Sequence, residues 1–260
     1  MAHSIDAIVL AGGVGDDVAR AENVLSKVAV NICGEPLLLR VIKAMHDAIT
    51  VRNIVVVTQP QLGELILNLS DQRIHLVHDA GSLWENVNCA INSLLEPSDM
   101  LLFAAGDTPF LRGELLDAFV EDGLSSGADI VYPIVSKAAY ERTFIGCKRT
   151  FVRLRDGIFT GGNCMLIRWR ILGSVSEVAK AAIAARKKPW QLARILGWKT
   201  LLKMPFGLLT IDELKSRAEH MLKCRIFVLV TDAAELAFDI DEVRHLEHAR
   251  RVCTQFSNPS

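Results

Sequence analysis

The fold follows from the stretch Phe103-Ala104-Ala105-Gly106-Asp107-Thr108-Pro109-Phe110-Leu111. An apolar run over residues 100–105 ends just before a lone carboxylate, Asp107. Pro109 has no backbone N–H, so it stops strand pairing soon afterwards. Asp107 is therefore expected just past the C-terminal end of a buried strand, where open α/β sheets bind their ligands. It is a candidate ligand of a divalent metal, and the alternative is a turn residue that precedes a helix.

Segments of strand and helix character alternate on both sides of this stretch. Strands are expected at residues 5–11, 53–58, 74–78, 100–105 and 129–135. Helices are expected at residues 37–48, with Pro36 at the first helical position, at 83–95 with Ser82 as the N-cap, and at 111–125. This alternation predicts a three-layer α/β fold, in which a mostly parallel sheet has helices on both faces.

The second half of the chain has a different pattern. Asp156-Gly157 is a two-residue hairpin signal between expected strands at 150–155 and 158–160. Further strands are expected at 164–168 and 225–231, and a closing helix follows residues 238–241. Residues 171–224 are mainly helical, and Thr210 with Glu213 forms a capping box for a helix over 211–222. Because no repeat or low-complexity linker interrupts the sequence, residues 1–260 are interpreted as one domain with a helical insertion at about 171–224.

Composition excludes several classes of protein. Half of the 260 residues are hydrophobic, which is enough to bury a full core. The apolar runs fall short of the roughly 20 residues that cross a bilayer, and the first residues lack the features of a signal peptide. The formal net charge of -1 offers no basic excess for nucleic acid. Six cysteines without a C-x-x-C pair make disulfide and zinc frameworks unexpected, and a reducing cytoplasm fits best.

A glycine-rich turn follows the first expected strand, with the sequence Leu10-Ala11-Gly12-Gly13-Val14-Gly15. Glycines after a strand let backbone N–H groups approach a phosphate closely. The Walker pattern and the dinucleotide fingerprint are both absent from this turn. Taken alone, a plain tight turn is an equal alternative.

Four elements in order resemble the MobA-like nucleotidyltransferase superfamily, which includes molybdenum-cofactor guanylyltransferases and sugar-nucleotide pyrophosphorylases. They are the glycine turn, Lys27, Gly34-Glu35-Pro36 and Gly106-Asp107-Thr108-Pro109. The resemblance covers residues 5–110 and resumes at Phe238-Asp239-Ile240-Asp241 with Leu246-Glu247, while residues 171–224 lie outside it. It implies a fold of the nucleotide-diphospho-sugar transferase type, an NTP and a small-molecule acceptor as substrates, and Mg²⁺ as cofactor.

The resemblance also implies a role for particular positions on the nucleotide side. The turn residues Leu10, Ala11, Gly12, Gly13 and Gly15 would wrap the triphosphate. Lys27 would neutralise phosphate charge through its long, mobile side chain, and a solvated surface lysine is the alternative. The base would contact Gly81, Ser82 and Asn86, for which a helix cap and its first turn are an equal alternative.

On the metal and acceptor sides, Asp107 and Asp241 would hold Mg²⁺, which takes few protein carboxylates together with substrate phosphates. The acceptor would be lined by Thr160, Gly161, Gly162 and Asn163. An acceptor phosphate or hydroxyl would attack the α-phosphorus of the NTP and release pyrophosphate. Such a reaction needs positioning and charge neutralisation and no protein nucleophile.

The chain departs from the family pattern after the glycine turn. The family usually carries an arginine there, whereas Asp16 and Asp17 follow Gly15, and Arg20 is a candidate replacement. Two carboxylates beside a triphosphate are unfavourable unless a cation offsets them. The alternative function is therefore a catalytically weakened nucleotide- or sugar-nucleotide-binding protein on the same scaffold. A glycosyltransferase fits least, because Thr108-Pro109 follow the carboxylate where those enzymes usually carry Asp-x-Asp.

Residues 186–206 combine cations, two tryptophans and apolar residues, as peripheral membrane helices do. Pro189 and Gly197 interrupt this segment, and Lys199 falls on its apolar face. A helical lid, an acceptor pocket or the contact of a homodimer are the alternatives to membrane binding.

Overall fold

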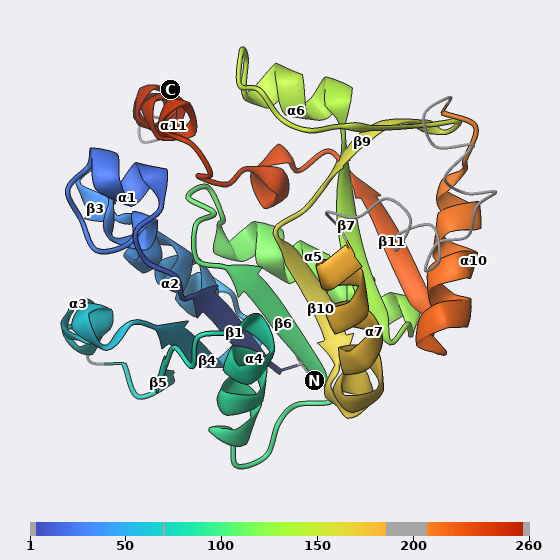
Figure 1. The fold of residues 1–260 in the computed structure, drawn as a ribbon, viewed down its shortest axis with the longest axis horizontal. Helices are drawn as coiled ribbons and strands as arrows, with labels where there is room; N and C mark the ends of the chain where they lie inside the picture. Colours follow the sequence, from blue (N-terminus) through green and yellow to red (C-terminus); the bar gives the residue numbers. More distant parts are fainter. Residues whose placement is uncertain (1–3, 70, 186–206, 257–260) are drawn as a thin grey trace.

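A computed structural model of the chain describes residues 4–69, 71–185 and 207–256. Within these ranges nine strands form one sheet in the order β5-β4-β1-β6-β10-β7-β9-β8, with β11 paired to β7 (Figure 1). The pairs among β5, β4, β1 and β6 are parallel, as is β7 with β11. Strands β10 and β9 pair with their neighbours in antiparallel fashion. The mostly parallel sheet that the sequence predicts is confirmed.

The strand bounds follow the apolar runs closely. The parallel half consists of β5 (Ile74–His78), β4 (Val51–Thr58), β1 (Ile5–Ala11) and β6 (Met100–Ala105). The other half consists of β10 (Cys164–Arg168), β7 (Ile130–Ser136), β9 (Gly157–Gly161), β8 (Val152–Leu154) and β11 (Ile226–Thr231). A separate two-stranded hairpin is formed by β2 (Asn31–Ile32) and β3 (Glu35–Pro36).

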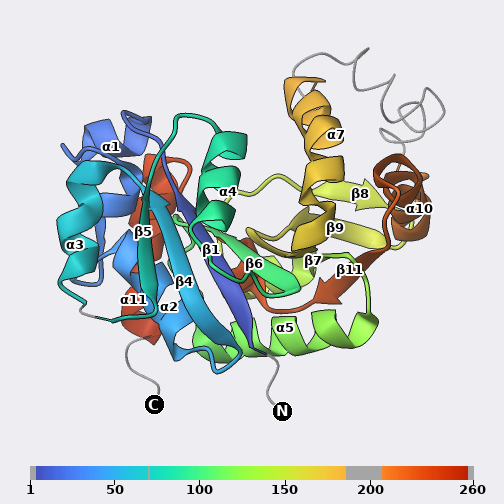
Figure 2. The same cartoon turned by 90° about the horizontal axis from the view of Figure 1, so that it is seen from below.

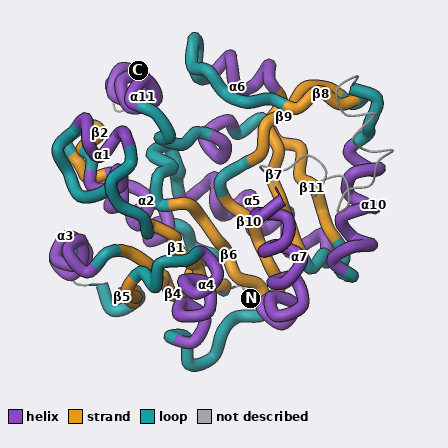
Figure 3. Tube along the Cα trace, viewed as in Figure 1, coloured by secondary structure: helices purple, strands orange, loops and turns teal. Residues whose placement is uncertain are grey.

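The helical elements connect these strands, as the tube in Figure 3 shows. The α-helices are α1 (Asp17–Ala21), α2 (Leu37–Asp47), α3 (Gly63–Leu67), α4 (Leu83–Asn92), α5 (Gly113–Ser126), α6 (Lys137–Thr143), α7 (Leu172–Ala185), α10 (Ile211–Leu222) and α11 (Val243–Phe256). Short 3₁₀ turns lie at η1 (Lys27–Ala29), η2 (Pro60–Leu62), η3 (Trp169–Ile171) and η5 (Ala234–Ala237).

Both faces of the sheet are covered, which gives three layers (Figure 2). On one face α2 and α5 contribute to a buried cluster that includes Ala7 of β1. On the other face α4 and α7 contribute to a second cluster that includes Ile8 of the same strand. Successive strand residues point to opposite faces, so a strand buried on both sides is a continuous apolar run. The predicted three-layer α/β fold is confirmed.

Several predicted boundaries need correction by a few residues. Pro36 is the N-cap of α2 and not its first helical residue, and α4 ends at Asn92 rather than at residue 95. Helix α5 begins at Gly113 and not at residue 111. A side chain at this first position would clash, since a Cβ on Gly113 would lie 2.7 Å from the backbone of Asp47.

The predicted hairpin turn also moves by one residue. Gly157 pairs with Leu154 in the ladder, so the turn is Arg155-Asp156 and not Asp156-Gly157. The Asp156 side chain is engaged elsewhere, because it accepts a hydrogen bond from the N–H of Ile211 at 2.8 Å. This bond connects the hairpin to the first turn of α10, whose predicted capping box at Thr210 is confirmed.

The helical insertion is described at its two ends, where α7 and α10 lie. The segment 186–206, for which the alternatives are peripheral membrane binding, a helical lid, an acceptor pocket or a dimer contact, lies outside the described residues. In the ranges that the structure covers, no helix combines the length and apolar character needed to traverse a bilayer.

One disulfide bond joins Cys33, in the β2–β3 hairpin, to Cys253 of α11, with Cα atoms 6.1 Å apart. The prediction that the cysteines form no disulfide is therefore wrong for this pair. Cys33 has a φ of 57° and is followed by Gly34 at 80°, as in a tight hairpin turn. The Arg250 side chain donates to the carbonyl of Asn31 at 3.2 Å, so α11 lies against this hairpin through polar contacts as well.

Candidate active site

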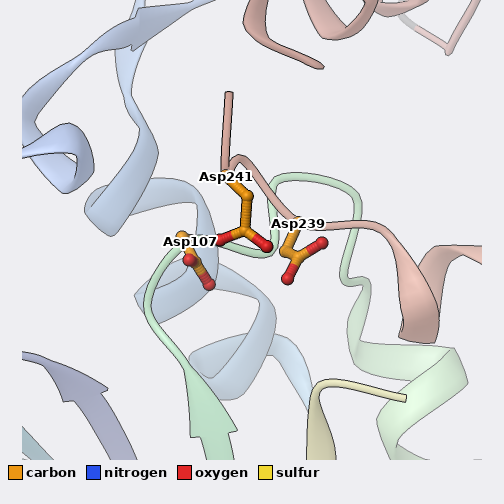
Figure 4. A group of neighbouring side chains, drawn as sticks. All are labelled: Asp107, Asp239 and Asp241. Carbon is orange, nitrogen blue, oxygen red and sulfur yellow. The ribbon is translucent and has the colours of Figure 1, made fainter. Parts of the chain in front are cut away.

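Three carboxylates converge where β6 ends. Asp107 follows β6, and Asp239 and Asp241 follow η5 (Figure 4). One oxygen from each carboxylate lies within 4.8 Å of the others. The structure thus brings Asp107 and Asp241 together, as the sequence predicts. Asp239 was not selected from the sequence, although it lies in the same Asp-x-Asp segment.

Backbone and ring contacts hold this acid cluster (Asp107, Asp239 and Asp241) together. The N–H of Ile240 donates to the carbonyl of Asp107 at 3.1 Å. The rings of Phe110 and Phe238, which flank the two segments, lie 5.1 Å apart between centroids. The close approach of the carboxylates is therefore built into buried structure and does not depend on their own charges.

Gly106 explains why a glycine precedes the first of these carboxylates. A Cβ on Gly106 would lie 2.7 Å from the Cβ of Ala11, closer than real side chains approach. The N–H of Gly106 also donates to the carbonyl of Leu10 at 2.9 Å. The start of the glycine turn and the first carboxylate are thereby placed side by side.

Lys27 lies between two members of the acid cluster. Its Nζ atom is 2.6 Å from Asp107 and 3.0 Å from Asp241. Burial lowers the pKa of Lys27, but the charges of Asp107 and Asp241 outweigh this effect and raise the pKa above its ordinary value. Lys27 also lowers the pKa of Asp241 against the opposing effect of burial. The lysine is therefore a charged bridge and not a solvated surface side chain.

Arg149 connects the third carboxylate to the predicted acceptor residues, and nothing in the sequence marks it. Its guanidinium pairs with Asp239 and donates from Nε to the hydroxyl of Thr160 at 3.2 Å. It also donates to the carbonyl of Gly161 at 3.4 Å and to the side chain of Asn163 at 3.5 Å. Burial raises the pKa of Asp239 to about 6, although Arg149 opposes the shift.

The turn between β9 and β10 is fixed by its backbone. The N–H of Gly162 donates to the carbonyl of Pro133 at 2.9 Å, and that of Asn163 donates to Leu236 at 2.7 Å. A Cβ on Gly162 would lie 2.7 Å from the ring of Pro133. The predicted acceptor residues therefore lie against the 3₁₀ turn η5 that leads into the acid cluster.

Asp79, like Asp239 and Arg149, is a site residue that the sequence does not predict. Its carboxylate accepts hydrogen bonds from the N–H of Gly13 at 3.1 Å and from Gln59 at 2.6 Å. It also accepts from the N–H of Gly81 at 3.0 Å and from Asn86 at 2.7 Å. Bonds from Gly81 and Asn86 are the main reasons that the pKa of Asp79 is lowered. Asp79 thus joins the glycine turn to the loop predicted to contact the base.

Two of the predicted base contacts have structural tasks within this loop. Ser82 caps α4 by accepting from the N–H of Glu85 at 3.3 Å. The buried side chain of Asn86 accepts from the N–H of Ala80 at 2.7 Å. Gly81, with a φ of 90°, is exposed beside them.

The two aspartates that follow the glycine turn are both engaged. Asp16 is the N-cap of α1 and accepts from the N–H of Ala19 at 2.8 Å. Asp17 pairs with Arg20, which also donates to the carbonyl of Gly15 at 2.5 Å. Arg20 therefore reaches back to the glycine turn, where the sequence pattern lacks its arginine.

Comparison with known proteins gives one family and a consistent fold. A family model described as the MobA-like NTP transferase domain matches residues 7–193. The structure of a hypothetical transferase from Thermus thermophilus is 35% identical, with a TM-score of 0.81 over 94% of this chain and 99% of that chain. A search of curated proteins found no match.

Two further structures are alike at lower identity. A 4-diphosphocytidyl-2C-methyl-D-erythritol synthase from Anaerococcus prevotii has a TM-score of 0.62 at 12% identity, covering 98% of this chain and all of that chain. A CMP:2-keto-3-deoxy-manno-octonic acid synthetase complexed with CTP has a TM-score of 0.62 at 13% identity, covering 97% and 99%. At such identities the likeness concerns the fold.

Proposed function

Because the chain belongs to the MobA-like NTP transferase family, we propose that it is a Mg²⁺-dependent nucleotidyltransferase. It transfers an NMP group from an NTP to a small phosphorylated or hydroxyl-bearing acceptor and releases pyrophosphate. The observation that carries the proposal is the convergence of Asp107 and Asp241, 134 positions apart in the sequence, around the Lys27 ammonium.

The acid cluster fits the metal that the family implies. Its donors are carboxylate oxygens, the ligands that Mg²⁺ prefers, and they lie within 4.8 Å of one another. Asp107 and Asp241 would hold the ion, with Asp239 beside them. When bound, Mg²⁺ neutralises charge on the phosphates and polarises a phosphoryl oxygen.

The nucleotide lies along the joined loops on the other side of Asp107. The glycine turn, Gly12, Gly13 and Gly15, would wrap the phosphates, with Leu10 and Ala11 at the base of the turn. In this structure the N–H groups of Gly13 and Gly15 donate to Asp79 and to the carbonyl of Leu25. The base would lie beside the exposed Gly81 and Ser82, and the buried Asn86 would support this loop through its bonds to Ala80 and Asp79. Asp79 supports this arrangement, since it connects the two loops by hydrogen bonds to Gly13 and Gly81.

The chemistry requires an in-line displacement at the α-phosphorus. An acceptor oxygen forms the new P–O bond, the bond to the oxygen bridging the β-phosphate breaks, and that oxygen leaves with pyrophosphate. Lys27 balances the negative charge of the phosphates, and Arg149 positions the strand turn that lines the acceptor side. These residues supply orientation and charge, which are the main requirements of phosphoryl-transfer sites.

The contacts of Asp16 and Asp17 bear on NTP binding. Asp16 caps α1 through the N–H of Ala19, and Asp17 pairs with Arg20 at the surface. A backbone donor and a cation therefore lie beside these carboxylates, and the departure from the family pattern does not exclude NTP binding.

The test is pyrophosphate release with each NTP, Mg²⁺ and a panel of sugar and polyol phosphates. Turnover with at least one pair is expected, and Asp107→Asn should abolish it. The control is Asp122→Asn, which makes the same change on the exposed face of α5. Absence of both turnover and NTP binding by calorimetry would refute the function, and full activity of Asp107→Asn would refute the metal assignment.

A further inference from the structure

A cavity of about 390 Å³ opens beside the acid cluster, on the side away from the glycine turn. Its lining includes Asp239 and Asp241 but none of the residues of the glycine turn or of the loop at Gly81. Small-molecule sites occupy roughly 300–1,000 Å³, so this volume suits one small metabolite. A molecule bound there would have one end next to the reacting centre and the other in the cavity.

The lining of the cavity carries charges of both signs. Its cations are Lys148, Arg149 and Arg244, and its carboxylates are Asp239, Asp241 and Glu242. Arg149 is committed to Asp239 and to the β9–β10 turn, as described above. Two cations, Lys148 and Arg244, are therefore left for a ligand.

The Lys148 ammonium is exposed and has no carboxylate partner among the residues that the structure describes. Arg244 pairs with Glu242 through two contacts of 2.6 and 2.8 Å, and both side chains are about half exposed. Because water screens an exposed pair, Arg244 can exchange Glu242 for a doubly charged ligand. A guanidinium and an ammonium that line one cavity are the groups that proteins use for phosphate.

His245 also lines the cavity, and its Nδ1 atom accepts from the N–H of Asp241 at 3.4 Å. The imidazole is thereby engaged with the segment of the acid cluster. The groups left for an anion are therefore Lys148 and Arg244.

We propose that this cavity is the acceptor site, and that the acceptor carries a phosphate monoester remote from its reacting oxygen, held by Lys148 and Arg244. The identity of the bound molecule as an acceptor rests on the proposed function, whereas the anion site does not. The reacting oxygen then lies at the acid cluster, and the phosphate lies beside Lys148 and Arg244.

The anion site is tested first without catalysis. Inorganic phosphate and glycerol phosphate are titrated into ¹⁵N-labelled protein that contains no nucleotide. Amide shifts at residues 148–150 and 244–245 are expected, and Lys148→Ala and Arg244→Ala should each weaken binding at least about tenfold, which is about 1.4 kcal/mol. The control is Arg142→Ala, which removes an exposed, paired arginine of α6 outside the cavity. Equal phosphate affinity in all variants, or shifts confined to other residues, would overturn the proposal.

The acceptor role is tested by kinetics. Pyrophosphate release is compared for acceptors with and without a second anionic group. Lys148→Ala should raise the acceptor KM at least about tenfold while leaving kcat and the NTP KM within about twofold. If no NTP turns over but phosphate still binds at residues 148 and 244, the proposed function fails and the anion site stands. If uncharged acceptors turn over best and the variants change nothing, the anion site fails and the function stands.

Discussion

Replacing Lys27 with methionine tests whether this lysine occupies the place of a divalent cation. The substitution keeps the length of the side chain but removes the charge that lies between Asp107 and Asp241. Two carboxylates then face each other with Asp239 nearby and no cation among them. The variant should lose stability in the absence of metal and regain part of it when Mg²⁺ is added.

The expected magnitude follows from the exposure of each partner. The side chains of Lys27 and Asp107 are 22% and 14% exposed, so this pair is close to the buried case. Removing one partner of a buried pair costs about 3–5 kcal/mol. The side chain of Asp241 is 58% exposed, and its pair contributes at most about 1 kcal/mol. A loss of about 3 kcal/mol is therefore expected for Lys27→Met in EDTA.

The free energy of unfolding is measured by urea denaturation, once in EDTA and once with Mg²⁺ at 10 times its dissociation constant. At that concentration, Mg²⁺ binding adds about 1.4 kcal/mol to the free energy of unfolding. Mg²⁺ should stabilise the variant more than the wild type, because no lysine has to leave the carboxylates first. Lys43→Met is the matched control, since Lys43 is 55% exposed and pairs with Glu35 at the surface. Equal stabilisation of wild type and variant by Mg²⁺ would refute the reasoning that lysine and metal compete for one place.

Three further predictions concern other parts of the molecule. Gly12→Ala should weaken NTP binding by at least about tenfold in calorimetry, because its Cβ would lie 2.8 Å from the Asp79 carboxylate; unchanged affinity would exclude a role for this contact. The pKa of Asp239 is raised by burial to about 6, so its charge destabilises the native state as pH rises from about 4 to 6. Asp239→Asn also leaves the Arg149 guanidinium without its carboxylate, so the measured quantity is the pH dependence. In EDTA, the free energy of unfolding from urea denaturation should fall less between about pH 4 and pH 7 for Asp239→Asn than for wild type. Reduction of Cys33–Cys253, which are 220 positions apart, should lower the free energy of unfolding by up to about 5 kcal/mol; a Cys33→Ser variant should show the same loss and no response to dithiothreitol.

The sheet could be predicted from the sequence because its central strands are buried on both faces. An apolar run such as β6, or β1 with its one charged residue Asp6, then marks a strand with little ambiguity, and the predicted bounds of both are confirmed. The boundaries that shifted depend on tertiary contacts, as at Gly113, where the backbone of another helix excludes a side chain. The local sequence around Gly113 gives no information about this contact with Asp47.

The residues of the candidate site likewise fall into those that the sequence predicts and those that only the tertiary structure reveals. Asp107 and Asp241 follow from motif order, and Asp239 could have been found from its place in the same segment. Arg149 and Asp79 carry no local signal, because each acts by joining loops that the topology alone brings together. The disulfide also has no local signal in the sequence, since Cys33 and Cys253 are 220 positions apart.

The carboxylates near the glycine turn, Asp79 and Asp16, differ from those of the acid cluster in whether their oxygens are available to bind a cation. Asp79 accepts four hydrogen bonds from fixed donors, and Asp16 caps a helix. The hydrogen bonds use the acceptor capacity of Asp79, and the helix cap uses one oxygen of Asp16. Asp107 and Asp241 instead share one lysine on a flexible stem. Their oxygens are held by an exchangeable charge beside a third carboxylate, Asp239, and this difference supports the proposal that the acid cluster is the metal-binding end of the site.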